Sequence, residues 1–175
     1  ANIGEVIVAT ENQEIVDEVK QNGGHAILTK NHHKTGTDRI YEALQKLDNS
    51  NIDLVMNLQG DEPMMNKDDI QNLNNHMIKN NSQLGTLASK ILNKKETYEN
   101  ENIVKVITKE KLNIENFSEA INFKRKITQQ NDNIYHHLGI YCYTKETLKK
   151  FVNLNQSSNE IKNKLEQLRA LDNDI

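Results

Sequence analysis

The chain has 175 residues, a formal net charge of −3 at pH 7 and a single cysteine. This length fits one domain with its own buried core, so neither a disulfide nor a structural metal is needed, and one cysteine excludes an intrachain disulfide. The charge gives no general attraction to nucleic acid or to an anionic membrane, and no window of about 18 apolar residues predicts a membrane-spanning helix. We therefore expect a cytoplasmic protein that binds neither nucleic acid nor membrane.

The first part of the chain predicts three successive strand–helix pairs. Short apolar runs at residues 5–9, 25–29 and 53–58 are typical of strands that are buried on both faces. A helical stripe follows each run, the first behind a predicted capping box from Thr10 to Gln13 and the third behind a predicted cap at Asn66. This alternation predicts an α/β fold with an open, mostly parallel, doubly wound sheet.

The second half of the chain has a less regular pattern. Strand-like runs at residues 85–92, 102–108 and 135–144 follow one another with few crossovers between them. A final helix is predicted over residues 158–171, behind a capping box that starts at Ser157. The sequence shows no repeat, no linker and no domain boundary, so residues 1–175 are interpreted as one α/β domain.

The strand at residues 53–58 ends in an unusual motif, Gln59-Gly60-Asp61-Glu62-Pro63. Ligands of parallel α/β sheets bind at the carboxyl ends of the strands, where Gly60 lets a ligand approach the backbone and Asp61 offers a carboxylate. Mg²⁺ prefers one or two carboxylates together with substrate phosphates, so Asp61 is a candidate metal ligand. A plain turn is the alternative, and the spacing alone supports both interpretations about equally.

A second candidate region is the loop and helix start Thr35-Gly36-Thr37-Asp38-Arg39. Hydroxyl groups and free backbone N–H groups at a helix start, next to the donor fork of Arg39, suit a nucleotide or a sugar. Simple capping by Thr37, with Arg39 in solvent, is the alternative that the residues alone favour.

A third candidate region is the strand at residues 135–143. Its alternation puts Leu138, Ile140 and Cys142 on one apolar face. The other face carries His137, Gly139, Tyr141 and Tyr143. A glycine between hydrogen-bonding side chains leaves room for a ligand, although a solvent-facing strand with incidental polar residues is the common alternative.

The final helix contains a fourth candidate group. Its predicted apolar stripe consists of Ile161, Leu165 and Leu168. Glu166 and Gln167 lie beside this stripe, and Glu166 could pair with Arg169 one turn later. The residues alone are interpreted as a solvated helix face.

Taken together, the motifs "VIVAT", "TGTDR", "NLQGDEP", "HHLGIY" and "LEQLRAL" occur in this order. The combination resembles the 3-deoxy-manno-octulosonate cytidylyltransferase family, also called CMP-KDO synthetases, over essentially the whole chain. The resemblance implies a nucleotide-diphospho-sugar transferase-like fold, and an enzyme that joins CTP and KDO to give CMP-KDO and pyrophosphate for lipopolysaccharide biosynthesis. It also implies dependence on Mg²⁺ and a homodimer.

The same resemblance implies roles for particular residues. Asp61 would be catalytic and would hold the Mg²⁺ ion. The substrate-binding residues would be Gln59, His137, Tyr141, Glu166 and Gln167. The residues near the nucleotide would be Thr35, Gly36, Thr37 and Arg39.

Three departures from the family pattern qualify this expectation. Family members begin with a strand and a basic phosphate loop, and later in the chain they carry a V-D-T-P-x-D segment. Neither pattern occurs in this sequence. Glu119 stands where members have a basic residue. We therefore expect a domain that is incomplete at both ends and has little or no turnover by itself. CMP-sialic acid synthesis and a non-catalytic binding or dimerisation module are the alternatives.

Overall fold

A computed structural model describes residues 3–47, 51–60, 65–114, 116–128 and 132–175. Its strands are β1 (Ile7–Thr10), β2 (His25–Leu28), β3 (Leu54–Asn57), β4 (Leu84–Ser89), β5 (Lys105–Thr108), β6 (Ala120–Lys124) and β7 (Ile134–Thr144). Its helices are α1 (Gln13–Gln21), α2 (Gly36–Gln45), α3 (Lys67–Lys79), α4 (Lys94–Glu99), α5 (Lys145–Val152), α6 (Ser158–Asn163) and α7 (Leu168–Leu171). The mixture confirms the predicted α/β class. Helices α4 and α5 and strand β6 had no counterpart in the sequence prediction.

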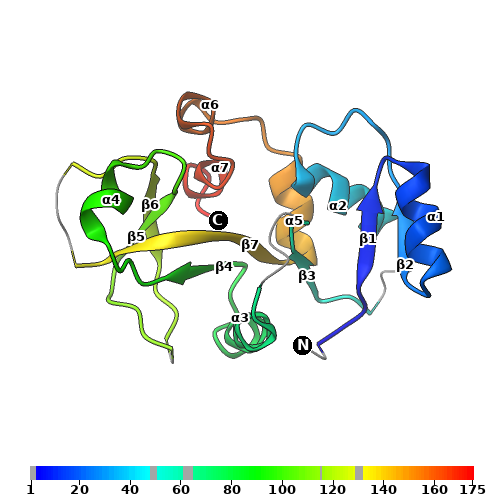
Figure 1. Ribbon diagram of the computed structural model, residues 1–175, viewed down its shortest axis with the longest axis horizontal. Helices are drawn as coiled ribbons and strands as arrows, with labels where there is room; N and C mark the ends of the chain where they lie inside the picture. The colour runs from blue at the N-terminus through cyan, green and yellow to red at the C-terminus, as the bar shows by residue number, and fades with distance from the viewer. Residues whose placement is uncertain (1–2, 48–50, 61–64, 115, 129–131) are drawn as a thin grey trace.

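The unit β1–α1–β2 lies at one end of the molecule (Figure 1). Its two strands pair in parallel, from Ile7 opposite His25 to Thr10 opposite Leu28. The predicted capping box of α1 is wrong, because Asn12 is the N-cap and accepts a hydrogen bond from the backbone N–H of Glu14. Thr10 is the last residue of β1, and its hydroxyl oxygen instead accepts from the N–H of Asn12.

The second sheet is organised around the long strand β7, which spans the middle of the molecule (Figure 1). Strands β3, β4 and β5 all pair with β7 in the antiparallel direction, and β6 pairs with β5. The expected mostly parallel sheet is therefore not confirmed. Strands β3 and β4, which α3 connects, run in the same direction, but β7 lies between them and pairs with both.

Each face of β7 is covered by different helices. On one face, Ile140 and Cys142 pack with Leu73 and Met77 of α3. Gly85 of β4 allows this close packing, because a Cβ atom there would lie 2.6 Å from the sulfur of Met77, which would have to move.

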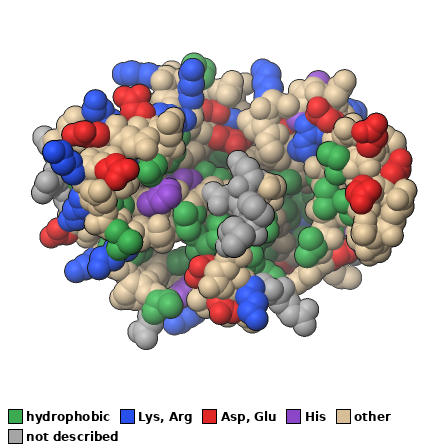
Figure 2. All heavy atoms as spheres, viewed as in Figure 1, with side chains coloured by type: hydrophobic (Ala, Val, Ile, Leu, Met, Phe, Trp, Pro, Cys, Tyr) green, Lys and Arg blue, Asp and Glu red, His purple; other side chains and the backbone are tan. Residues whose placement is uncertain are grey.

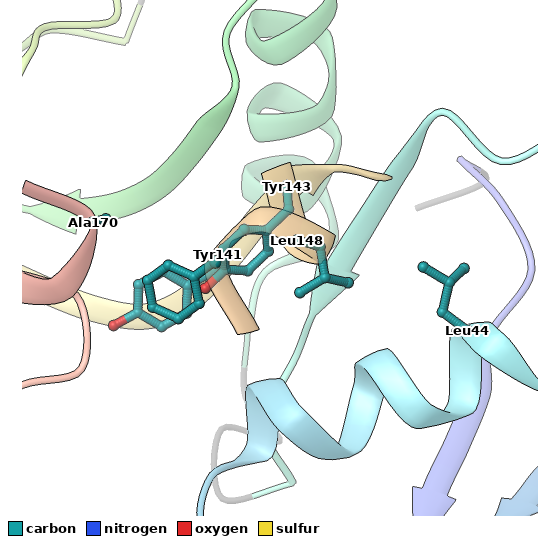
Figure 3. Packing of buried hydrophobic residues seen from close by; sticks show 6 residues of the cluster. Leu44, Tyr141, Tyr143, Leu148 and Ala170 are labelled. Atoms are coloured by element: carbon teal, nitrogen blue, oxygen red, sulfur yellow. The ribbon is translucent and has the colours of Figure 1, made fainter. Parts of the chain in front are cut away.

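The opposite face of β7 is covered by α2, α5 and α7. Its buried cluster consists of Leu44, Tyr141, Tyr143, Leu148, Phe151 and Ala170. Figure 3 shows the two tyrosine rings of β7 next to each other, with side chains of α2 and α5 to one side and Ala170 of α7 to the other. This face of the sheet carries the candidate site.

The predicted final helix over residues 158–171 is two short helices. The predicted capping box is confirmed, because Ser157 and Glu160 exchange hydrogen bonds between side chain and backbone. Helix α6 then ends at Lys164, whose φ of 52° and ψ of 49° are left-handed. The chain turns there, and α7 begins at Leu168 in a new direction.

Candidate active site

The centre of the candidate site is the face of β7 that carries His137 and Tyr141. Their ring centroids lie 5.6 Å apart, and the rings of Tyr141 and Tyr143 lie 6.2 Å apart. A Cβ atom on Gly139, between them, would meet nothing within 4 Å. The structure thus confirms the predicted grouping of these side chains and the predicted space at the glycine. The interpretation as a solvent-facing strand is wrong, because Tyr141 and Tyr143 are buried.

His137 is held in one tautomer by Thr86 of β4. The Thr86 hydroxyl oxygen lies 2.7 Å from the carbonyl oxygen of Ile140, 3.1 Å from that of Leu138 and 3.0 Å from His137 Nε2. Because the carbonyls can only accept, the hydroxyl donates to them and accepts from His137 Nε2–H. Burial and the neighbouring His136 lower the pKa of His137 to about 4, so the ring is neutral at pH 7 and Nδ1 is a hydrogen-bond acceptor.

Glu166 reaches the same region from the turn between α6 and α7. Its Oε2 accepts a hydrogen bond from the Thr37 hydroxyl at 3.2 Å, across 129 positions of sequence. Its Oε1 is buried and has no hydrogen-bond partner in the part of the chain that the structure describes, although Arg169 Nη2 lies 3.9 Å away. Burial raises the pKa of the Glu166 carboxyl. Oε1 is therefore an acceptor that a ligand can use.

The turn that carries Glu166 and Gln167 is fixed by a buried ion pair. Arg169 Nε and Nη2 donate to the two carboxylate oxygens of Glu160 at 2.8 and 2.5 Å, and its guanidinium carbon lies 4.7 Å from the ring centroid of Phe151. Such a two-pronged pair fixes geometry as well as charge. The sequence interpretation as a solvated face is wrong, because Gln167 and Arg169 are 8% and 4% exposed. The left-handed end of α6 turns these residues toward β7.

The start of α2 supplies the next wall of the site. Thr35, not Thr37, is the N-cap, and its side chain accepts from the N–H of Asp38 at 3.2 Å. Thr37 is instead buried against Glu166. For a Cβ atom on Gly36, the one neighbour within 4 Å among the described residues would be Nδ2 of Asn57, at 4.0 Å. Three of the four predicted nucleotide-site residues therefore sit at one helix start, next to Glu166.

Arg39 is the predicted site residue that makes contacts elsewhere. Its Nη1 donates to the Thr29 hydroxyl at 2.6 Å, and its Nη2 pairs with Glu11 at 2.5 Å. Glu11 follows β1 and Thr29 follows β2, so Arg39 ties α2 to the ends of both strands. The interpretation of Arg39 as a solvent-exposed side chain is wrong, and its contact with a nucleotide stays a prediction.

The motif after β3 is only partly described. Gln59 and Gly60 are exposed beyond the end of the strand, and Asp61 lies outside the described residues. The described parts of the chain contain no group of three or more His, Cys, Asp or Glu side chains that could hold a metal ion. Mg²⁺ does not require such a group, because substrate phosphates and water complete its coordination.

Two residues of the site were missed by the sequence prediction. Thr86 sets the tautomer of His137, and Asn57 ends β3 opposite Tyr141 with its side chain buried. The signal for Asn57 was a polar residue at the last position of an apolar strand. Thr86 gave no signal, because only the pairing of β4 with β7 brings it to the histidine.

The surface on the face shown in Figure 2 mixes charges of both signs. Lys and Arg side chains alternate with Asp and Glu side chains around the rim, and hydrophobic side chains gather toward the middle. Among the described side chains of this face there is no broad basic patch. Separately, none of the helices in the described ranges combines the length and apolar character that crossing a membrane requires.

The sequence pattern of one family, described as Cytidylyltransferase, matches residues 1–175. The chain belongs to the cytidylyltransferase family. This family member is 43% identical to the 3-deoxy-manno-octulosonate cytidylyltransferase of Thermodesulfovibrio yellowstonii over 99% of this chain and 71% of the relative. It is 37% identical to the enzyme of the same name from Bartonella tribocorum, over 100% of this chain and 72% of that protein.

A solved structure agrees with the family assignment. The structure is that of CMP:2-keto-3-deoxy-manno-octonic acid synthetase complexed with CTP, and it superposes with a TM-score of 0.87 at 32% identity. The match covers 100% of this cytidylyltransferase chain and 70% of the solved chain. The likeness therefore extends over both sheets and the whole candidate site.

Proposed function

We propose that this cytidylyltransferase uses CTP and KDO as substrates and makes CMP-KDO and pyrophosphate, in the cytoplasm, for lipopolysaccharide biosynthesis. The names of its relatives support the choice of sugar. The observation that carries the proposal is the pairing of the His137 and Tyr141 rings on one face of β7, with the Glu166 carboxyl close enough to act electrostatically on the Tyr141 phenol. A polyhydroxylated sugar needs hydrogen-bond acceptors for its hydroxyl groups, and His137 Nδ1 and Glu166 Oε1 are two buried acceptors.

The proposed reaction is one displacement at phosphorus. The anomeric hydroxyl oxygen of the sugar forms a bond to the α-phosphorus of CTP, and the bond from this phosphorus to the bridging oxygen breaks. Pyrophosphate leaves with that bonding pair, and the hydroxyl proton passes to solvent. Positioning and charge stabilisation carry most of such a reaction, so the neutral His137 and the carboxyl of Glu166 would orient the sugar rather than form covalent bonds.

We propose Mg²⁺ as the cofactor, with Asp61 as its protein ligand. When bound, the ion would neutralise charge on the phosphate oxygens. Asp61→Asn should raise the Mg²⁺ concentration needed for half-maximal activity, and it should weaken the Mg²⁺-dependent gain in CTP affinity measured by calorimetry. Asp69→Asn, an exposed change on α3, is the control. Equal Mg²⁺ dependence of both variants would remove Asp61 from the metal site.

We propose in addition that two chains form a homodimer. Large exposed apolar side chains on β6 (Ile121), before α4 (Leu92) and in the connection between β5 and β6 (Ile114) support an interface in this part of the chain. Light scattering should give twice the mass of one chain. Replacing Ile121 by Lys should shift the protein toward the monomer, whereas a monomeric wild-type protein would contradict the proposal.

The function is tested by pyrophosphate release from CTP, with Mg²⁺ and either KDO or N-acetylneuraminic acid as acceptor. The natural-length protein should release pyrophosphate with KDO and not with the sialic acid, and the low turnover expected of residues 1–175 alone is measured beside it. Glu166→Gln should reduce kcat/KM at least tenfold, whereas Glu146→Gln, an exposed change on α5, should not. Saturable KDO binding without release in any natural-length form would favour a binding module instead.

A further inference from the structure

Asn57 has a buried donor group that the protein does not use. The residue is 4% exposed, and its Nδ2 has no hydrogen-bond partner among the residues that the structure describes. Burying an amide N–H group without an acceptor is unfavourable, so a donor of this kind needs an explanation. A ligand that supplies the acceptor is one such explanation.

The position of Asn57 places this donor at the candidate site. Asn57 is paired with Tyr141 across β3 and β7, so both side chains project from the same face of the sheet. That face is the one covered by α2 and α7, where Tyr141 and Tyr143 pack (Figure 3). Nδ2 lies 4.0 Å from the position of a Cβ on Gly36, so the absence of a side chain there keeps the space beside the amide open.

Glu166, in the turn between α6 and α7, offers the complementary group beside the first turn of α2. Its Oε2 is bonded to Thr37, the residue next to Gly36, and its Oε1 is buried without a hydrogen bond. The first turn of α2 is therefore bordered by one unused donor and one unused acceptor. A hydroxyl group both accepts and donates, so a polyhydroxylated ligand satisfies both groups at once.

We propose that Asn57 is a substrate-binding residue that donates from Nδ2 to a hydroxyl oxygen of the acceptor sugar acid. The same hydroxyl, or a neighbouring one, donates to Glu166 Oε1. This inference rests on the proposed function and adds to it a residue outside the predicted site. A ribose hydroxyl of CTP has the same chemistry, so the experiment separates the two sources.

The test is calorimetric binding to the natural-length protein in EDTA, which prevents turnover. KDO is titrated into protein saturated with CTP, and CTP is titrated separately. Asn57→Leu and Asn57→Asp should each weaken KDO binding at least tenfold and leave CTP binding within about twofold. Asn75→Asp, an exposed change on α3, is the matched control and should change neither affinity.

Thermal unfolding separates a ligand contact from a structural role. Asn57→Leu removes the unpaired donor, so its melting temperature should not fall below that of the wild type, even though it binds KDO less tightly. A lower melting temperature with unchanged KDO affinity would overturn the proposal. If the Asn57 variants bind CTP more weakly than the wild type does, but bind 2′-deoxy-CTP as tightly as the wild type does, the contact is with the ribose. That result would overturn the assignment to the sugar acid. CTP binding without any KDO binding by the wild type would instead overturn the proposed function.

Discussion

The β1–α1–β2 unit and the sheet around β7 are held together in different ways. The first is a continuous segment, residues 7–28, in which Val16 is the buried residue of the helix. The second pairs Leu54 with Thr144, and its clusters contain Leu73, Ile140 and Leu148 at 0% exposure. Of the predicted sugar-site residues, Gln59 is exposed beyond the end of β3. The others, His137, Tyr141, Glu166 and Gln167, lie in the second sheet or against it. This difference indicates that the candidate site depends on packing between segments far apart in sequence, while the β1–α1–β2 unit can unfold locally.

The largest expected effect is in the cluster that joins β7 to α5. Leu148→Ala should lower the free energy of unfolding by about 2–5 kcal/mol, because it leaves a cavity beside Tyr143 and Phe151. Urea denaturation measures the change. Ile78→Ala, at a residue of α3 that is 66% exposed, is the control and should have almost no effect. Equal effects of the two variants would mean that this cluster does not stabilise the second sheet.

A buried lysine gives the next largest effect. Lys105 of β5 is 0% exposed, and its ammonium donates to the carbonyl oxygens of Asn100, Ile103 and Arg125. Lys105→Met should destabilise the protein by about 2–3 kcal/mol, because these acceptors lose their donor. The control is Lys109→Met, where the lysine side chain is 66% exposed. A Met variant as stable as the wild type would show that water replaces the ammonium.

Val16→Ala addresses the smaller unit directly. The change should lower the free energy of unfolding by about 1–2 kcal/mol. Hydrogen exchange should show which strands lose protection. The amides of β1 and β2 should exchange faster, while those of β7 keep their protection. If β7 also loses protection to the same extent, the two regions unfold as one and the comparison fails.

These expectations show what the sequence could and could not predict. Apolar runs located β2 and β3 to within a residue or so, and the period of two along residues 135–143 correctly grouped His137 with Tyr141. The insertion of β7 between β3 and β4 was not predictable, because it depends on pairs far apart in sequence. The break at Lys164 was also missed, since lysine is not a signal for left-handed backbone, and this break is what buries Gln167.

The smallest predicted effect concerns α2, which contacts strands of both sheets. Glu42 forms an ion pair with Lys46 at 2.6 Å and a hydrogen bond with His33, and these contacts lower the pKa of its carboxyl from 4.5 to about 2. The carboxylate therefore stabilises the fold above about pH 4.5, and the contribution is lost as the pH falls toward 2. Glu42→Gln should lower the free energy of unfolding by only about 1 kcal/mol near pH 7. The effect is small because the Lys46 side chain is 45% exposed, so solvent screens the ion pair.

Denaturation at a series of pH values measures this difference. The gap in stability between the wild type and Glu42→Gln should close between about pH 4.5 and 2. A gap that persists at the acid end would mean that the carboxylate charge is not what ties α2 to the loop before it.

The tyrosines of β7 have an optical consequence. The chain contains five tyrosines and no tryptophan, so its near-ultraviolet fluorescence comes from tyrosine alone. The Tyr141 ring lies 5.6 Å from that of His137 in the candidate site, and burial raises the pKa of its phenol, which keeps the ring in its neutral, emitting form at ordinary pH. A ligand bound beside these two rings should alter the emission of Tyr141. The protein thus contains its own unlabelled reporter of ligand binding.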